Sequence, residues 1–541
     1  QVFRNLIDNA LQHAPQGTPV DIVLDDAGVL VVRNGGTPVP AAPRTRRPPV
    51  STSPKPADDR LHGMERVSSR IIGSSIAAAL GGFLFGFDTS VINGAVGALS
   101  AEFSLGAGLT GFAVSSALLG CAVGAWFAGS LANRFGRIPV MVIGAILFFV
   151  SAIGSGLAFG VWDLIVWRLV GGLGVGAASV IAPAYIAEVA PARYRGRLGS
   201  LQQLAIVLGI FAALLSNAVI ANTAGGAAES YWFGVAAWRW MFMIEAVPAA
   251  IYGVMALFLP ESPRYLIGKG ERDKASKVLY DFTGELDVNL KIEQISHSLE
   301  RESRESLRDL LGGRFGLLPI VWLGIALSLF QQLVGINVIF YYSTTLWQSV
   351  GFDESQALLT STITSVMNIV ATIIAILLVD RVGRRVMLLV GSAGMTVSLG
   401  LMALAFSFGE TAAGAESVSL PDPWSTVALI SANAFVMFFG TTWGPLVWVL
   451  LGEIFPNRIR ASALAVAAAA QWGANWAVSA TFPTLSEIGL SFAYGLYAAF
   501  ALLSLLFVAR WVPETKGREL EDMDQLRLGR RGSADDVAAD G

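Results

Sequence analysis

Long, nearly uncharged apolar runs, separated by short polar connections, fill the chain between residues 71 and 511. A transmembrane helix needs about 20 consecutive apolar residues to cross a hydrocarbon layer of about 30 Å. By this measure the runs predict twelve membrane-spanning helices, six on each side of a longer charged stretch. The first six centre on Phe83, Leu119, Ala145, Gly174, Leu208 and Val247. The second six centre on Phe330, Val370, Leu388, Phe438, Ala470 and Leu502.

The composition excludes a water-soluble enzyme. Hydrophobic residues make up 54% of the 541 residues and charged residues only 14%, whereas soluble domains carry about 45–50% apolar and roughly 25% charged residues. The net charge of −3 gives no basic excess, so we expect no nucleic-acid partner. The single cysteine, Cys121, excludes an intrachain disulfide and a CxxC metal or redox site. No phosphate-binding GxxxxGK[ST] motif occurs, and we expect no metal, no cofactor and no enzymatic activity.

The distribution of arginine predicts the orientation in the membrane, because cytoplasmic loops carry an excess of basic residues. The connections after the odd-numbered spans contain a single arginine, Arg239. The connections after spans two, four, eight and ten contain Arg134, Arg137, Arg193, Arg195, Arg197, Arg381, Arg384, Arg385, Arg458 and Arg460. Both termini and the charged central stretch are therefore predicted to be cytoplasmic, with the protein in the cell membrane.

Three motifs occur twice, in the same order, in the two groups of spans. The pairs are NRFGR at 133–137 with DRVGR at 380–384, ExxPxRxR from Glu188 and from Glu453, and PES at 260–262 with PET at 513–515. Repetition at this length scale indicates duplicated units. It predicts two six-helix halves, related as parallel repeats, that pack around a central site.

Two interpretations of the repeated charges remain open. Charges at loop ends are typical of a topology signal on solvated loops. Alternatively, they form a gate that holds the cytoplasmic ends of the halves together in the outward-open state, because the planar fork of arginine binds a carboxylate bidentately. The candidate gate residues are Arg134, Arg137, Glu188, Arg193, Arg195, Glu261, Arg264, Asp380, Arg381, Arg384, Arg385, Glu453, Arg458, Arg460 and Glu514.

Together these motifs resemble the sugar porter family of the major facilitator superfamily. The sequences PESPR at 260–264, PETKG at 513–517, QQLVGIN at 331–337 and GPLVW at 444–448 carry the resemblance further. It runs from about residue 70 to residue 520 and is strongest to bacterial proton-coupled glucose permeases and xylose symporters. It implies an all-α membrane protein with the twelve-helix major facilitator fold. It also implies a carrier that imports a monosaccharide together with a proton by alternating access.

Two ionisable residues, Asp88 and Arg168, lie inside apolar runs. Such charges cost about 2.5–3.5 kcal/mol each at a helix centre, so we expect them to face the interior and pair. A static buried ion pair is one explanation. The other is proton coupling, because burial favours the neutral form of a carboxylic acid and a neighbouring guanidinium favours its charged form. The resemblance implies coupling, since aspartate at this position is typical of proton symporters.

Side-chain amides and aromatic rings match the hydroxyls and the C–H faces of a monosaccharide. Gln471 and Asn475, four residues apart, share one helix face, and Gly335 permits a break that turns Asn337 toward the same cavity. Amides also join helices, at about 0.6 kcal/mol on average, so each one alone has this second explanation. The resemblance implies a sugar site. The candidates are Gln203, Gln331, Gln332, Asn337, Asn368, Trp448, Gln471, Trp472, Asn475 and Phe85.

Ile210 lies where the xylose symporters tend to have a second glutamine, which favours D-glucose as the substrate. An uncoupled facilitator, a symporter of xylose or another pentose, and an exporter of drugs or metabolites remain alternatives. We expect the carrier to act as a monomer in the lipid bilayer.

The first 60 residues do not follow the carrier pattern. Residues 3–13 predict an amphipathic helix and residues 20–32 a hairpin. This part resembles the start of a histidine-kinase ATPase domain, in which Asn9 would match a magnesium-ATP ligand. The glycine-rich lid motifs are missing and about 40 residues are too few to fold alone, so we expect no working ATP site and a carrier that starts near Met64. A membrane sensor that signals through residues 1–63 is the remaining alternative.

The predicted organisation follows from these boundaries: 1–40, a partial histidine-kinase-like fragment; 41–66, a proline-rich linker; 67–260, the first six-helix bundle; 261–316, a cytoplasmic helical linker; 317–520, the second six-helix bundle; and 521–541, a disordered tail.

Overall fold

The computed structural model describes residues 20–24, 30–34, 69–190, 195–281, 287–302, 307–312, 316–411, 418–456 and 459–515. Two compact units divide the chain, Gln1–Arg66 and Val67–Gly541. In the first unit, β1 (Val20–Leu24) and β2 (Leu30–Asn34) pair as an antiparallel hairpin, as the sequence predicted. The predicted helix at 3–13 and Asn9 lie outside the described residues.

The second unit is a helical bundle with two halves. The helices of the first half are α2 (Ser69–Val91), η1 (Ile92–Gly94), α3 (Val96–Glu102), α4 (Ala107–Phe135), α5 (Arg137–Gly156), α6 (Val161–Val189), α7 (Arg195–Ala224), η2 (Trp232–Gly234), α8 (Ala237–Met243) and α9 (Ala246–Leu257). Within it α4 and α5 pack on α6, and α2 packs on α7. Gly120 and Gly172 face each other where α4 crosses α6, and a Cβ on either would meet the other backbone. Such small residues let helices approach closely in a membrane.

The second half repeats this plan. Its helices are α13 (Pro319–Leu333), α14 (Ile336–Ser349), α15 (Glu354–Val382), α16 (Arg384–Ser407), α17 (Trp424–Thr441), α18 (Trp443–Ile454), α19 (Arg460–Ile488) and α20 (Leu490–Trp511). Here α16 packs on α17 and α20, and α13 packs on α19. The loop after α16 contains the short antiparallel strands β3 (Glu410–Thr411) and β4 (Val418–Ser419).

All twelve predicted span centres lie in helices of the bundle. Among the described residues, eleven helical segments are long and apolar enough to cross a membrane. The twelfth is α19, whose 29 residues equal the length of α4, but whose amides Gln471 and Asn475 lower its mean hydropathy. It packs against α4 and α13 in the middle of the bundle. The predicted twelve-helix fold is confirmed.

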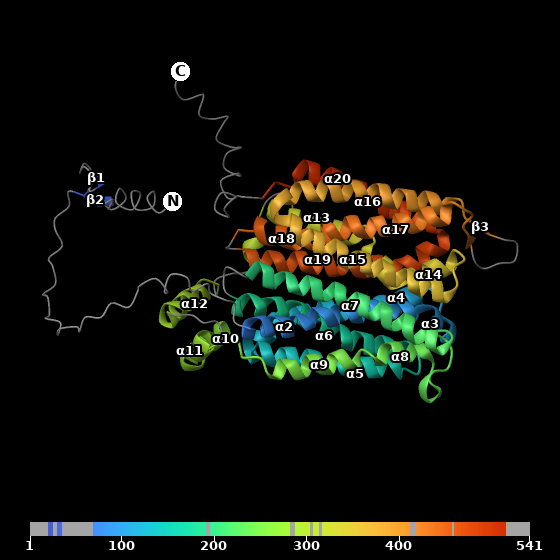
Figure 1. Ribbon diagram of the computed structural model, residues 1–541, viewed down its shortest axis with the longest axis horizontal. Coiled ribbons are helices and arrows are strands. Elements are labelled where there is room, and N and C mark those ends of the chain that lie inside the picture. The colour runs from blue at the N-terminus through green and yellow to red at the C-terminus, as the bar shows by residue number, and fades with distance from the viewer. Residues whose placement is uncertain are drawn as a thin grey trace, which may run out of the picture. The chain divides into compact units, whose positions relative to one another are not determined.

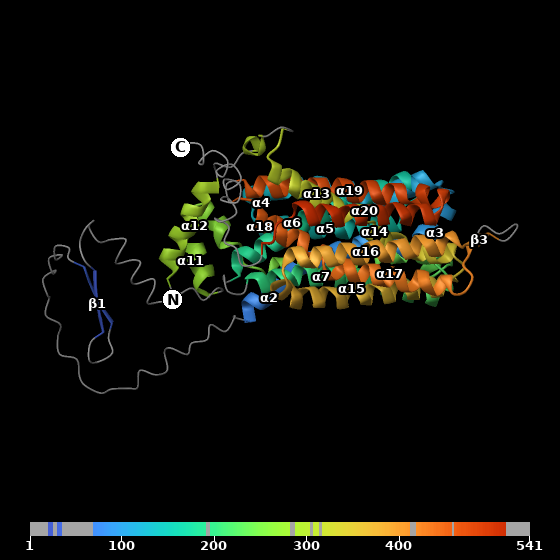
Figure 2. The same ribbon diagram turned by 90° about the horizontal axis from the view of Figure 1, so that it is seen from above.

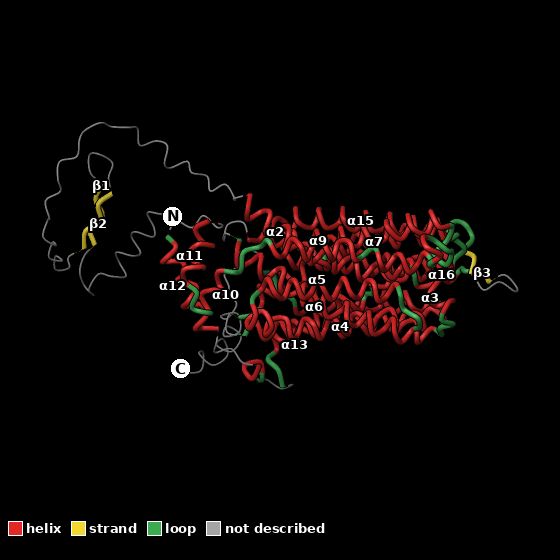
Figure 3. The backbone as a smooth tube through the Cα atoms, turned by 90° about the horizontal axis from the view of Figure 1, so that it is seen from below, coloured by secondary structure: helices red, strands yellow, loops and turns green. Residues whose placement is uncertain are grey.

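Figure 1 shows the two halves lying side by side along the length of the bundle. They meet along two helix pairs, α4 with α19 and α7 with α15. The connection between the halves forms α10 (Pro263–Gly268), α11 (Arg272–Asp281) and α12 (Val288–Glu302), followed by η3 (Leu307–Leu310). Figures 2 and 3 show α10, α11 and α12 beyond one end of the bundle, whereas α3 and β3 lie at the other. The helical linker predicted from the charged stretch is therefore present.

Candidate functional site

Four of the described membrane spans are interrupted. The first breaks after α2, the sixth between α8 and α9, the seventh at Gly335 and the tenth at Thr442. Gly335 has a φ of 80°, and the Tyr497 ring occupies the space where a Cβ would stand, so a larger residue would be strained and crowded there. Breaks of this kind are tolerated where the backbone is buried in protein or lines a cavity. The break predicted at Gly335 is present.

Asp88 and Arg168 form a buried ion pair between α2 and α6. The Arg168 Nη1 atom donates to Asp88 Oδ1 at 2.8 Å and to the Asp88 carbonyl oxygen at 3.2 Å. Each side chain is only 2% exposed. The other carboxylate oxygen, Oδ2, and the Arg168 Nε have no hydrogen-bond partner. Both residues thus face the interior, as their insertion cost required, with hydrogen-bonding capacity left over.

A second carboxyl group, Glu245, belongs to the same cluster and was missed from the sequence. It lies between α8 and α9, is buried, and interacts electrostatically with both Asp88 and Arg168. Its Oε1 has no hydrogen-bond partner. The Phe242 ring, one turn before it, lies 5.8 Å from the Arg168 guanidinium. The rule that singled out Asp88, an ionisable residue inside an apolar run, applies equally to Glu245.

The amides of the second half form a connected network. Gln471 donates from Nε2 to Gln331 Oε1 at 2.6 Å, which joins α19 to α13. Gln331 donates from its own Nε2 to the carbonyl oxygens of Trp443 and Gly444, each at 3.0 Å, at the break between α17 and α18. Both N–H groups and the oxygen of the Gln331 amide thereby have protein partners, whereas the buried Gln471 Oε1 has none. This buried oxygen therefore keeps an unused capacity to accept a hydrogen bond.

The other predicted amides of the second half lie on α14, α15 and α19. Asn337, the second residue of α14, donates to Gln332 Oε1 at 2.7 Å and so spans the break at Gly335. Asn475 is buried on α19 and accepts from Ser479 at 3.2 Å. Asn368 is buried on α15, against Gly440 of α17, where an added Cβ would meet its Oδ1.

The aromatic candidates differ in their surroundings. The rings of Phe85 on α2 and Trp472 on α19 meet edge to face, with centroids 5.6 Å apart, so they join the two halves next to Gln471. Trp448 on α18 is 43% exposed. Gln203 is half-buried on α7, and its neighbour Gln202 is buried against Gly82 of α2.

Asn93, in η1, ties the halves together at the end opposite α10–α12. Its Nδ2 donates to the Phe340 carbonyl and to Ser343 Oγ, both at 2.8 Å. Its Oδ1 accepts from the Thr344 backbone N–H at 3.0 Å. All these partners belong to α14, in the other half. The sequence offered no signal for this role, because the partners lie about 250 positions away.

Comparisons with known proteins decide the family. A profile described as "Sugar (and other) transporter" matches residues 74–526. The chain belongs to this family. The "Glucose transport protein" of Synechocystis is 56% identical over 448 residues, which cover 82% of this chain and 95% of that protein. The "D-xylose-proton symporter" of Escherichia coli K12 is 37% identical over 492 residues, covering 85% and 96%.

Solved structures give the same result for the fold of this sugar transporter. The partially occluded, inward-open xylose transporter XylE from E. coli matches with a TM-score of 0.71 at 35% identity, covering 82% of this chain and 100% of that one. An inward-open XylE structure matches with a TM-score of 0.70 at 36% identity, covering 84% and 99%. The protein is thus a multi-pass membrane protein with the major facilitator fold.

The duplicated loop motifs of this sugar transporter make equivalent contacts in the two halves. Glu261 accepts the backbone N–H groups of Arg137 at 3.0 Å and Ile138 at 3.2 Å, and so caps the start of α5. Glu514 accepts those of Arg384 at 3.0 Å and Arg385 at 3.1 Å, at the start of α16. A carboxylate at a helix N-terminus satisfies free N–H groups and interacts favourably with the helix dipole.

The glycine of each motif leaves room for this cap. Gly136 and Gly383 have φ angles of 104° and 103°, in the region that favours glycine. At each, a Cβ would collide with the capping glutamate. This geometry explains the glycine in both RxGR motifs.

The arginine that follows each glycine pairs with the glutamate of ExxPxRxR. Arg137 binds Glu188 bidentately, with Nε–Oε2 at 2.9 Å and Nη2–Oε1 at 2.8 Å. Arg384 Nη2 lies 2.9 Å from Glu453 Oε1. Each of these pairs lies within one half, so pairing between the halves stays a prediction for the outward-open state.

The remaining gate candidates lie at the same end of the bundle. Arg134 and Arg381 are exposed, Arg264 is half-buried on α10, and Arg460 donates from Nε to the Phe455 carbonyl at 3.2 Å. The side chains outside the described residues are those of Arg193, Arg195, Asp380 and Arg458.

Replacing Asn93 by alanine is expected to separate the halves at the α3–α14 end. Three hydrogen bonds are lost, together about 2–3 kcal/mol, which is roughly a 30- to 150-fold change in the conformational equilibrium. Spin labels on cysteines at the exposed positions Ala101 and Ser355, in a Cys121→Ser background, measure the distance. Asn433→Ala, which removes a bond within α17, is the control. An unchanged distance distribution in Asn93→Ala would show that other contacts hold this end closed.

Proposed function

We propose that this sugar transporter is a proton-coupled symporter that imports a hexose, D-glucose first, through the cell membrane by alternating access. Its 56% identity to a protein named for glucose transport supports the hexose, and the proton symporters among its relatives support the coupling. The observation that carries the proposal is the buried cluster of one guanidinium and two carboxyl groups, formed by Arg168 with Asp88 and Glu245.

Charge balance explains how this cluster handles a proton. One arginine neutralises one carboxylate, and a second unneutralised carboxylate is costly inside the membrane. A proton on one of the two carboxyl groups removes that cost while the cluster is closed. When water reaches the cluster, or Arg168 moves, the proton leaves. Asp88, with its unpartnered Oδ2, is the group we assign to proton transfer, and Glu245 is the second acid.

The proposed sugar site adjoins the cluster through two helices. Phe85 and Asp88 are three residues apart on α2, hence on one face. Phe85 contacts Trp472, which follows Gln471, the residue with the free amide oxygen. A sugar bound by the α13 and α19 amides therefore acts on α2 through the contact between Trp472 and Phe85. Because α2 also holds Asp88, this contact is a direct route for coupling.

The same geometry supports a working cycle within a monomer. In the orientation that the loop arginines predict, with both termini cytoplasmic, the hydrogen bonds from Asn93 to α14 close the extracellular end. The structure then represents an inward-facing state. When the carrier faces outward, these hydrogen bonds break and the RxGR and ExxPxRxR motifs form the gate between the cytoplasmic ends of the two halves.

A competition panel on the purified carrier in liposomes tests the proposal. Radiolabelled D-glucose counterflow is measured against unlabelled D-glucose, D-xylose, D-galactose and L-arabinose, with the external pH recorded in de-energised vesicles. We expect D-glucose to compete best and sugar addition to alkalinise the medium. Better competition by D-xylose would assign a pentose, counterflow without alkalinisation an uncoupled facilitator, and the absence of sugar competition an exporter.

A further inference from the structure

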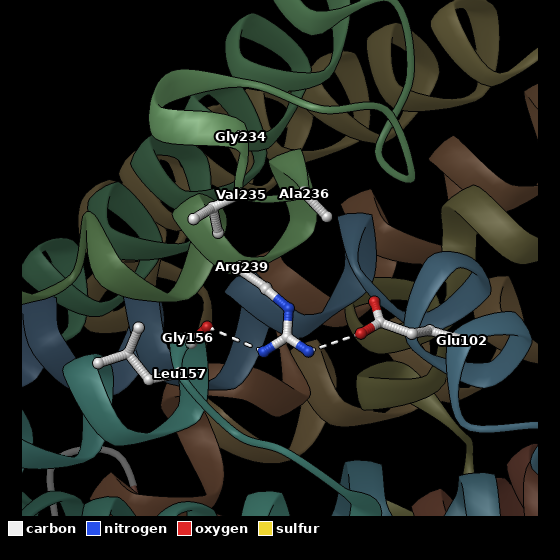
Figure 4. A pocket seen from close by; sticks show the side chains of 7 residues that line it. All are labelled: Glu102, Gly156, Leu157, Gly234, Val235, Ala236 and Arg239. Atoms are coloured by element: carbon white, nitrogen blue, oxygen red, sulfur yellow. Dashed lines mark hydrogen bonds and ion pairs between the residues drawn. The ribbon is translucent and has the colours of Figure 1, made fainter.

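A pocket of about 430 Å³ opens at the bundle end opposite α10–α12, outside the proposed sugar site. It is lined by Glu102, Gly156, Leu157, Gly234, Val235, Ala236 and Arg239. Figure 4 shows Arg239 in the middle, between the end of α5 and the Glu102 carboxylate. Its volume is within the range of about 300–1,000 Å³ typical of small-ligand sites.

The two charged groups are held rigidly but keep free hydrogen-bonding capacity. Arg239 binds Glu102 Oε1 at 2.6 Å and the carbonyl oxygens of Gly156 and Ala158 at 3.2 and 2.6 Å. The Trp238 indole donates to Glu102 Oε2 at 2.7 Å. A guanidinium has five N–H donors and a carboxylate about four acceptor positions. Two donors of Arg239 and two positions of Glu102 are thus not used by these bonds. The Arg239 side chain is 15% exposed, with its guanidinium 4.4 Å from the Trp238 ring centroid, and the Glu102 side chain is 40% exposed.

Exposed aromatic residues place this pocket at the depth of lipid headgroups. Phe233, at the tip of the turn before α8, is 93% exposed and has a φ of 58°. Trp232, Phe159 and Trp162 are also exposed at this end. In water such a surface would be unfavourable, whereas tryptophan and other aromatics are enriched where a membrane meets water. The pocket entrance therefore faces the leaflet opposite α10–α12, the outer leaflet in the predicted orientation.

We propose that the pocket binds the headgroup of a phosphatidylethanolamine in this leaflet, with the phosphate on Arg239 and the ammonium on Glu102. A single cation beside a single anion matches a zwitterion rather than an anionic lipid. The primary ammonium has three N–H donors for the carboxylate, whereas the quaternary ammonium of phosphatidylcholine has none. Arginine suits the phosphate because its fork binds such oxygens bidentately.

A bound headgroup would join three parts of the first half, since Glu102 ends α3, Gly156 ends α5 and Arg239 belongs to α8. The adjoining turn also contacts the second half, because the Ala227 N–H donates to Glu354 of α15 at 2.9 Å. Lipid at this pocket would therefore stabilise the closed α3–α14 end, and this consequence is independent of which sugar is carried.

Native mass spectrometry of the delipidated full chain tests the proposal. The lipids are phosphatidylethanolamine, its N,N-dimethyl form, phosphatidylcholine and phosphatidylglycerol, all with identical acyl chains. We expect affinity to fall with each methylation, with an overall preference of at least about tenfold for the primary amine, the factor of one charge-assisted hydrogen bond. Equal retention of all four lipids would overturn the proposal. It would also be overturned if soluble glycerophosphoethanolamine displaced the bound phosphatidylethanolamine as effectively as the intact lipid does.

Two variants test the binding of the ammonium and of the phosphate separately. Glu102→Gln keeps an acceptor for Trp238 and should abolish the preference for the primary amine while phosphate binding persists. Arg239→Gln should weaken all four lipids, and Arg239→Lys should restore part of the loss. Arg510→Gln, at an exposed arginine beside Trp511 at the opposite end, is the matched control. If Arg239→Gln does not fold, Glu102→Gln decides alone, because an unchanged lipid preference in that variant excludes the site.

Discussion

Replacing Asp88 by asparagine is expected to abolish uphill sugar accumulation while leaving sugar exchange intact. Asparagine keeps the shape and a hydrogen bond to Arg168 but neither carries nor releases a proton, so the sugar gradient loses its energy source. One charge moved across 100 mV supplies about 2.3 kcal/mol, which corresponds to an approximately 50-fold sugar gradient. In energised vesicles the variant should fall from such a ratio to equal concentrations, measured with labelled D-glucose, with counterflow retained.

Two further variants make this result specific. Asp163→Asn removes a carboxylate at the start of α6, the helix that holds Arg168, where it accepts the Phe159 N–H at the surface, and this variant should accumulate sugar normally. Glu245→Gln removes the second acid of the cluster. Accumulation that survives in Asp88→Asn and disappears in Glu245→Gln would assign proton transfer to Glu245 instead.

Gln331→Leu is expected to weaken sugar binding by roughly 30-fold. Leucine has a similar size but cannot hold the Gln471 amide, which then no longer presents its free oxygen, and it leaves the Trp443 carbonyl without this donor. Two lost hydrogen bonds of about 1 kcal/mol each give this factor. Titration calorimetry of D-glucose on the purified carrier measures the affinity.

Gln471→Leu should have a smaller effect, about fivefold, because one ligand bond is lost and Gln331 keeps its backbone contacts. Gln294→Ala, on the exposed face of α12, is the control. If Gln331→Leu lowered the melting temperature but left the affinity unchanged, the amides would serve only as hydrogen bonds between helices.

Hydropathy predicted the helices because each membrane span must satisfy the same length and apolarity on its own. The weakest span by this measure, α19, is the one that brings Gln471 and Asn475 into the bundle interior, so the residues that obscure the helix also mark the site. The break at Gly335 was visible because glycine permits its φ angle. The break at Thr442 lies three residues before Pro445, which has no N–H to donate to the Thr441 carbonyl.

The sequence by itself determined the number of spans, the duplication and the presence of a buried acid and base, since the cost of a polar group in hydrocarbon is set residue by residue. Only the tertiary structure decided which groups meet. Glu245 joins Asp88 and Arg168, Asn93 finds α14 about 250 residues away, and the RxGR arginines pair within their own halves. A hydrogen bond requires its atoms within about 3 Å, and such proximity between distant segments arises only when the helices pack.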